Sequence, residues 1–400
     1  MGSKAFVVNT GVITAIGNDT EACRQSLMNG NSGISKATYL QTYWQDELPV
    51  GEVKLSNEAL ALMSGISPSF PRTALLSAVA VKEVWGPFEE RTKGLRIGFF
   101  SANTVGGMDL TEKLYTEFKD RKDYSNIREI VHHECGAITE LVSRHFHISG
   151  FTTTVSTACS SSANSIMMAA QMIENDLLDI AIAGGADCLS LFTLNGFNTL
   201  MILDKQPCQP FDNNRRGLNL GEGAGYLLLM NEKAKEQCNA DAICTVSGYA
   251  NANDAYHQTA SSPEGTGNKL AMQQAIEKAG IQPSDIDYIN LHGTGTANND
   301  NSEGIAISEL FGRNPPKASS TKGFTGHTLG GCGGVEAVFC ALAIRDGMVF
   351  PNLRWQTQME GLSWKPVTTL ETGLPITHVL SNSFGFGGNC SSLVLSKLEA

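Results

Sequence analysis

The stretch VSTACSSSANSI, residues 155–166, places a single cysteine between a β-branched run and a row of small hydroxyl residues. We expect a helix to begin near Ser160, so that Cys159 lies at a helix N-terminus, where unpaired N–H groups and the helix dipole favour an anion. The thiolate is the nucleophilic form of cysteine, and the small neighbours leave room for a substrate. From these residues alone, Cys159 is either a nucleophile or a buried thiol that only packs.

Two histidines lie in glycine-rich stretches that could supply hydrogen-bonding or acid–base groups. His292 opens HGTGT at the end of an apolar strand, where the glycines permit close backbone approach. His327 lies in KGFTGHTLGGCGG, five residues after Lys322. A histidine at the carboxyl end of a strand in an α/β sheet lies where sites form. Each histidine alone could also be a hydrogen-bonded structural imidazole.

A fourth stretch, NSFGFGGN at residues 382–389, is a glycine-rich turn between two strands. Such a turn either is simply tight or points a backbone N–H at a ligand, as in half of an oxyanion hole. None of the glycine stretches has the GxGxxG spacing of a dinucleotide-binding turn. Together the four stretches predict one site with a cysteine nucleophile, two histidines, a lysine and an N–H donor, although they are far apart in the chain.

The elements that must position these residues alternate between β-branched runs and helical patterns, which predicts an α/β protein. The pattern restarts after about residue 240, so we expect two similar halves, 1–240 and 241–400, packed into one body. We expect Asp300 or Asn301 to cap the helix at 300–312. The other expected helices cover 267–280 and 333–347, and the expected strands include 4–14, 95–104, 151–158, 179–187, 223–231, 242–252 and 286–296.

Composition excludes several classes of protein. Lys and Arg number 29 against 40 Asp and Glu, and this net charge of −11 argues against nonspecific nucleic-acid binding. No apolar run is long enough to span a bilayer, and the N-terminus has no long apolar segment, so we expect no membrane association and a cytoplasmic location. The ten cysteines form no CxxC pair or zinc-ligand spacing, so we expect neither a disulfide framework nor a structural zinc site.

Five motifs, in this order, resemble those of the β-ketoacyl-acyl-carrier-protein synthases, the condensing enzymes of the thiolase superfamily that elongate fatty-acid and polyketide chains. The motifs are TACSSS (157–162), QPFDNNRRGLNLGEGAG (209–225), HGTGT (292–296), KGFTGHTLGGCGGVEAV (322–338) and NSFGFGGN (382–389). The resemblance covers essentially the whole chain. It implies an α/β fold of the thiolase type, a duplicated five-layer αβαβα body that is usually a homodimer.

The resemblance also implies a role for each motif residue. The nucleophile would be Cys159, beside the paired catalytic histidines His292 and His327. The remaining implied roles are those of Lys322 beside the histidines, Glu336 as an organiser of the site, the backbone N–H groups of Cys159 and Phe386 as an oxyanion hole, and Thr294 and Thr296 as partners of the phosphopantetheine arm.

The implied reaction is a decarboxylative Claisen condensation. The Cys159 thiolate would attack the thioester of an acyl-carrier protein while two N–H groups hold the oxyanion. Malonyl-carrier protein would then lose its carboxylate, and neutral imidazole N–H groups would stabilise the resulting enolate. The carbanion would attack the acyl-cysteine and release a β-ketoacyl chain. No permanently bound cofactor and no metal are expected, since the phosphopantetheine arm belongs to the substrate.

Three related classes differ at identifiable positions. The initiating synthases use a Cys–His–Asn set, whereas the third position here is His327. Thiolases condense without decarboxylation and use a second active-site cysteine, for which Cys390 is the candidate. A silent subunit resembling a chain-length factor would shape a heterodimer without chemistry, but such subunits typically lack the nucleophilic cysteine that is present here.

The surface that docks the acidic carrier protein departs from the family pattern. Elongating synthases often carry several basic residues on the docking helix, whereas residues 59–72 contain only Arg72. This departure suggests a specialised carrier partner. The alternative basic residues are Lys119, Arg121 and Lys122, or Lys205 and Arg215.

The acyl tunnel is expected near SANTVGGMDL, residues 101–110, at the dimer interface. By resemblance, Met108 would limit the depth of this tunnel. Methionine and leucine also pack without any such role, so the sequence assigns no chain length.

Overall fold

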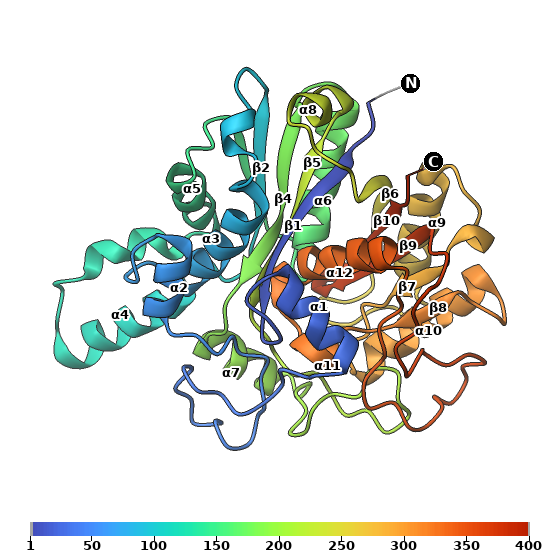
Figure 1. The fold of residues 1–400 in the computed structure, drawn as a ribbon. Coiled ribbons are helices and arrows are strands. Elements are labelled where there is room, and N and C mark those ends of the chain that lie inside the picture. Colours follow the sequence, from blue (N-terminus) through green and yellow to red (C-terminus); the bar gives the residue numbers. More distant parts are fainter. Residues whose placement is uncertain (1–2, 399–400) are drawn as a thin grey trace.

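In the computed structural model, which describes residues 3–398, ten strands join into one sheet in the order β3-β2-β4-β5-β1-β6-β10-β9-β7-β8 (Figure 1). Counted from the middle of the sheet outward, one half has the order β1-β5-β4-β2-β3 and the other has the order β6-β10-β9-β7-β8. The two halves therefore have the same strand order. We propose that this repeat reflects the two predicted halves, whose boundary falls just before β6. The strands are β1 (Phe6–Thr14), β2 (Ile97–Ala102), β3 (Phe151–Val155), β4 (Ile180–Asp187), β5 (Gly223–Met230), β6 (Cys244–Asn253), β7 (Tyr288–Asn290), β8 (Lys317–Ser319), β9 (His378–Gly385) and β10 (Asn389–Ser396).

Helices cover the two halves of the sheet and also fill the space between them, which confirms the expected five-layer αβαβα fold (Figure 1). In the middle layer, α6 (Ser161–Glu174) and α12 (Cys332–Asp346) contact each other and strands of both halves. On one outer face, α3 (Arg72–Trp85) packs on β1, β4 and β5, and on the other, α9 (Thr266–Ala279) packs on β6 and β10. The remaining α-helices are α1 (Thr20–Asn29), α2 (Asn57–Ser64), α4 (Met108–Arg121), α5 (Cys135–His145), α7 (Leu191–Thr199), α8 (Glu232–Gln237), α10 (Ala297–Phe311) and α11 (Lys322–Thr325).

Three apolar clusters form the core, and the middle one encloses α12, whose residues from Cys332 to Ile344 are all buried. Glycines allow this helix to approach β5 closely. A Cβ on Gly334 would lie 2.3 Å from the carbonyl oxygen of Gly225, which no side chain tolerates. The glycine-rich motif therefore serves helix packing as well as the site. Among residues 3–398, no helix is long and apolar enough to cross a bilayer.

The predicted elements agree with the structure except around the first histidine. The strand expected at 286–296 ends at Asn290, because Gly293 (φ 33°) and Gly295 (φ 85°) turn the chain into a loop. The helix expected at 300–312 begins three residues earlier, and its N-cap is Thr296, not Asp300 or Asn301. The capping prediction was wrong because Asp300 points back into the protein, where it accepts the backbone N–H groups of Gly295 and Phe211.

Candidate functional site

The turn between β3 and α6 presents Cys159. Ala158 adopts a left-handed conformation (φ 54°), which is uncommon for a residue with a Cβ, and this sharp turn directs Cys159 toward the second half of the molecule. The Cys159 side chain is 7% exposed, and its sulfur lies 3.1 Å from His327 Nε2. Residues 168 positions apart in the chain are therefore in hydrogen-bond contact.

Burial is the largest influence on the Cys159 thiol and raises its pKa to about 11. The Lys322 ammonium and the backbone N–H groups of Phe386 and Cys159 act in the opposite direction and lower this pKa. From the sequence we expect the helix N-terminus to favour the thiolate of Cys159. Desolvation has the larger effect, so the resting cysteine is a thiol. The same N–H groups remain aimed at the sulfur, where they stabilise negative charge as it develops.

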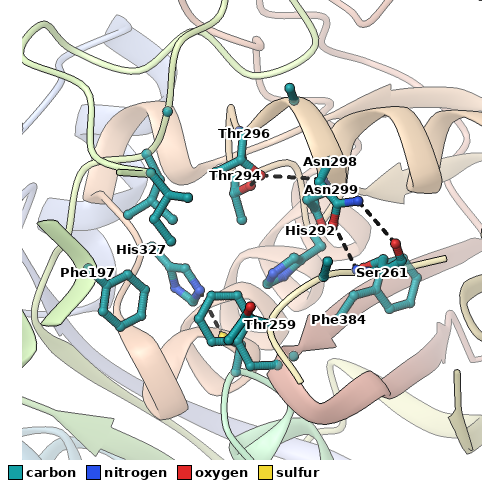
Figure 2. Close-up of a pocket in the computed structure, with 18 of the residues that line it drawn as sticks. Phe197, Thr259, Ser261, His292, Thr294, Thr296, Asn298, Asn299, His327 and Phe384 are labelled. Atoms are coloured by element: carbon teal, nitrogen blue, oxygen red, sulfur yellow. Dashed lines mark hydrogen bonds between the residues drawn. The ribbon is translucent and has the colours of Figure 1, made fainter. Parts of the chain in front are cut away.

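The two histidines lie side by side, with ring centroids 5.4 Å apart and planes at 86°, and both rings point into one pocket (Figure 2). His327 Nδ1 accepts the backbone N–H of Leu329 at 3.2 Å. His292 Nδ1 lies 3.3 Å from Lys322 Nζ, and an ammonium group can only donate. Since Nδ1 is an acceptor in both rings, each neutral imidazole carries its proton on Nε2.

Electrostatics keep both imidazoles neutral at physiological pH. Burial is the main cause that moves the pKa of His292 and that of His327 well below 6.5, and the Lys322 ammonium moves both further in the same direction. The sequence-based expectation of neutral imidazoles that donate N–H hydrogen bonds agrees with these shifts.

Lys322 and Glu336 form a buried ion pair behind the histidines. Burial alone would lower the pKa of Lys322, but the Glu336 carboxylate reverses this and leaves it raised. Burial raises the pKa of Glu336 to about 7, against the opposing effect of Lys322. We regard the pair as ionised at neutral pH, because each group is the other's close partner. The pair fixes the donor that faces His292.

Two cavities meet at Cys159. A cavity of about 310 Å³ is lined by Cys159 together with both histidines, Thr294, Thr296 and Phe386, so it contains most of the predicted site residues (Figure 2). A second cavity of about 190 Å³ shares Cys159 and Phe386 with the first, and Met108 lies in its wall. Phe197 stacks on Phe386 at 5.7 Å and borders both cavities.

The sequence analysis missed a carboxylate that hydrogen-bonds to the first histidine loop, residues 291–296 between β7 and α10. Glu303 on α10 is fully buried, and it accepts the backbone N–H groups of His292 at 2.9 Å and of Gly293 at 2.8 Å. Asn382 on β9 donates to the same carboxylate at 3.1 Å. The signal in the sequence was an acidic residue at each of positions 300 and 303, one helical turn apart, just after HGTGT.

A second missed carboxylate, Asp187 at the end of β4, joins the two walls around Cys159. It accepts the N–H of Gly330 at 2.7 Å, beside the segment that orients His327. It also accepts the N–H groups of Thr104 at 2.9 Å and Val105 at 3.1 Å, which lie in the wall of the smaller cavity. No motif in the sequence pointed to this residue, because its partners come from two segments, 104–105 and 330, that are far from it in the chain.

The structure also corrects three residues that the sequence offered for other roles. Arg72 is 8% exposed and pairs with Glu222 at 2.7 Å, so it is a structural residue and not part of a docking surface. The Arg215 side chain is only 6% exposed and faces Asp300. Cys390 donates to Asn268 and lines neither cavity, whereas the second thiol near the nucleophile is Cys332, whose sulfur lies 3.1 Å from the Cys159 carbonyl oxygen.

Comparison with known proteins places this site in a family context. Family models described as "Beta-ketoacyl synthase, N-terminal domain" and "Beta-ketoacyl synthase, C-terminal domain" match residues 4–235 and 243–356. A 3-oxoacyl-[acyl-carrier-protein] synthase 2 of Staphylococcus aureus (strain COL) is 32% identical over 415 residues, which cover 99% of each chain.

Two solved structures are similar over nearly their full length. The ishigamide ketosynthase/chain length factor matches with a TM-score of 0.93 at 26% identity, covering 100% of each chain. A complex of the ketosynthase ApeO with its chain length factor ApeC from Xenorhabdus doucetiae matches with a TM-score of 0.87 at 30% identity, covering 99% of this chain and 98% of that chain.

Proposed function

Because the chain belongs to the beta-ketoacyl synthase family, we propose that it extends an acyl chain by decarboxylative condensation with malonyl-acyl-carrier protein. One observation carries this proposal: Cys159 and two imidazoles protonated on Nε2 converge at the point where two cavities meet. A nucleophile with neutral N–H donors suits a reaction that first forms an acyl-cysteine and then an enolate.

Acyl transfer is the first step. The Cys159 sulfur attacks the thioester carbonyl of the acyl-carrier protein, and the backbone N–H groups of Cys159 and Phe386 receive the oxyanion. The carbon–sulfur bond to the arm breaks, and the departing thiolate takes the proton that Cys159 gives up. Losing one such donor typically costs about 3 kcal/mol of barrier.

Decarboxylation and condensation follow in the same pocket. The malonyl thioester oxygen receives the Nε2–H groups of His292 and His327 as carbon dioxide leaves and an enolate forms. The enolate carbon attacks the acyl-cysteine carbonyl, and the Cys159 thiolate departs and regains a proton from solvent. Neutral histidines serve this step because an imidazolium would quench the carbanion.

The two cavities suit the two parts of the substrate. We place the phosphopantetheine arm in the larger cavity, along Thr294 and Thr296, whose hydroxyl groups are 2.9 Å apart and line its wall. We place the acyl chain in the smaller cavity, with Met108 at its wall. The carrier protein then approaches the mouth of the larger cavity, where Arg216 is exposed. A homodimer and a cytoplasmic location remain predictions from the sequence.

A silent subunit is the alternative that the comparisons raise, since both solved structures contain a chain length factor. The contact between Cys159 and His327 favours an active synthase over a silent subunit.

The test combines Cys159→Gln with acyl- and malonyl-carrier proteins, with products weighed by mass spectrometry. We expect Cys159→Gln to lose condensation and to keep decarboxylation of the malonyl group, because the amide cannot be acylated but both imidazoles remain. His327→Ala should lower decarboxylation as well. Elongation of acyl chains by Cys159→Gln would show that the nucleophile is misassigned.

A further inference from the structure

The site contains two sets of side chains with the composition of transition-metal ligands, and both sets include His292. In the front set, the ligand atoms of Cys159, His292 and His327 all lie within 4.8 Å of one another. In the rear set, the same holds for His292, Cys332 and Glu336. One thiolate with two imidazoles, or with an imidazole and a carboxylate, is a ligand set that Zn²⁺ accepts, with metal–ligand distances of about 2.0–2.3 Å.

The groups that contact Nδ1 of the two histidines are hydrogen-bond donors, whereas a metal site has acceptors at that position. A metal-bound histidine almost always donates its second ring N–H to a carboxylate, carbonyl or water. Here the Leu329 N–H points at Nδ1 of His327, and the Lys322 ammonium points at Nδ1 of His292. A metal at Nε2 would force a proton onto Nδ1, where it would face a donor.

The protein already places a cation, the ammonium group of Lys322, among the rear ligands. The Lys322 ammonium contacts both His292 and Glu336, two of the three rear ligands, and is 1% exposed. Glu336 keeps a second carboxylate oxygen, Oε2, that is buried and has no hydrogen-bond partner among the described residues. Removing the ammonium would therefore leave the Glu336 carboxyl group beside a thiol and a ring nitrogen, with no cation between them.

We propose that Lys322 excludes transition-metal ions from this site in two ways. Its ammonium group occupies the space between the rear ligands, and it holds His292 in the tautomer whose protonated Nε2 cannot bind a metal in the front set. Cys332 makes the exclusion necessary, because a thiol turns the rear set into one that binds zinc or cobalt. This inference concerns metal binding and stands independently of the condensation reaction.

The experiment titrates the full chain with Co²⁺, whose bond to a thiolate absorbs in the near ultraviolet. We expect no such band in the wild type, and no protection of Cys159 from iodoacetamide by Zn²⁺. Lys322→Met should bind Co²⁺ about 10- to 100-fold more tightly than the wild type, the usual size of an effect from groups behind a metal ligand. Lys322→Arg keeps a cationic donor and should bind no better than the wild type.

Double variants locate the site. Lys322→Met/Cys332→Ala should lose the cobalt–thiolate band, whereas Lys322→Met/Cys159→Ala should retain it. The proposal is overturned if the wild type binds Co²⁺ as tightly as Lys322→Met, if folded Lys322→Met binds none, or if the band depends on Cys159 and not on Cys332. Should Lys322→Met fail to fold, protection of wild-type Cys159 by Zn²⁺ would itself overturn the proposal.

Discussion

The donors behind His292 and His327 determine which ring nitrogen carries a proton, and therefore what each imidazole offers to a substrate. Both donors point at Nδ1, so both Nε2–H groups face the pocket. Leu329 adopts a left-handed conformation (φ 51°), which places its N–H within reach of His327. Backbone strain at Ala158 and Leu329 thus lies at the nucleophile and behind one histidine, where it contributes to the arrangement of the site.

The raised pKa of Cys159 predicts a pH dependence for its alkylation. Below a pKa of about 11, the thiolate fraction rises with pH, so the iodoacetamide rate at Cys159 should increase about tenfold per pH unit between about pH 7 and 9. Peptide mass spectrometry would follow the modification, and Cys159→Ala would give the background from the other thiols. A rate that is already constant above pH 7 would contradict this expectation.

At the scale of elements, α10 determines the position of the first histidine loop. The strand before it has only three residues, and the glycines of HGTGT leave the loop few constraints of its own. Glu303 supplies the missing constraint by binding two consecutive backbone N–H groups of that loop. The helix therefore acts on the chemistry through a carboxylate that touches no substrate.

Replacing this carboxylate should slow the step that depends on His292. In Glu303→Gln, an amide N–H would face backbone N–H groups, and losing a hydrogen bond to a charged group costs about 1.5–3 kcal/mol. We expect malonyl decarboxylation to fall about 10- to 100-fold, with little change in the KM for the acyl-carrier substrate. Glu309→Gln, on the same helix but with a half-exposed side chain, is the matched control and should behave as the wild type. Equal loss in both variants would argue against a positioning role.

At the scale of the whole molecule, one edge of the sheet and a neighbouring surface are unpartnered in the single chain. Among residues 3–398, β3 ends the sheet and pairs only with β2. Exposed edges of this kind are commonly covered by another strand or chain. Large apolar side chains are also exposed on α4 and the segment after it, including Tyr124, Ile130 and Val131.

We expect this surface to be the interface of a dimer, with sedimentation at twice the chain mass of 42.8 kDa. Charged residues at buried apolar positions oppose association, so Ile130→Glu/Val131→Glu should shift the protein toward monomers. Tyr43→Glu, at a position that is 90% exposed, is the control and should remain dimeric. Monomers in the wild type alone, or an unaffected double variant, would exclude this interface.

The mouth of the larger cavity predicts how the carrier protein is recruited. Arg216 lines this cavity and has a 60% exposed side chain, and charges at the rim of an interface mainly change association rates. Arg216→Glu should raise the KM for acyl-carrier protein severalfold, with the kcat and the rate with a small thioester unchanged. Lys233→Glu, on helix α8 and with a 64% exposed side chain, should have no effect. An equal loss with the small thioester would point to damage inside the pocket.

The sequence alone determined the fold class and the strands and helices that carry the motifs, and it named Cys159, both histidines, Thr294, Thr296 and Phe386 among the residues that line the larger cavity. These properties follow from local patterns, such as the glycine-rich turns and the alternation of β-branched and helical segments. The motif residues Cys159, His292 and His327 were identifiable because each lies in a distinctive short stretch. The cap at Thr296 was missed because Asp300, a better cap by type, is drawn into contacts made by distant residues.

Only the tertiary structure decided the chemical state of the site. The pKa of Cys159 depends on how deeply the turn is buried, which no local pattern reports. The proton positions on the two imidazoles depend on Leu329 and Lys322. Both lie in the segment 322–331, which the first half holds through hydrogen bonds from Gly33 N–H to the Phe324 carbonyl and from Gly330 N–H to Asp187. Desolvation and hydrogen-bond direction arise from contacts between segments far apart in the chain, so the sequence could name these residues without showing what each one donates or accepts.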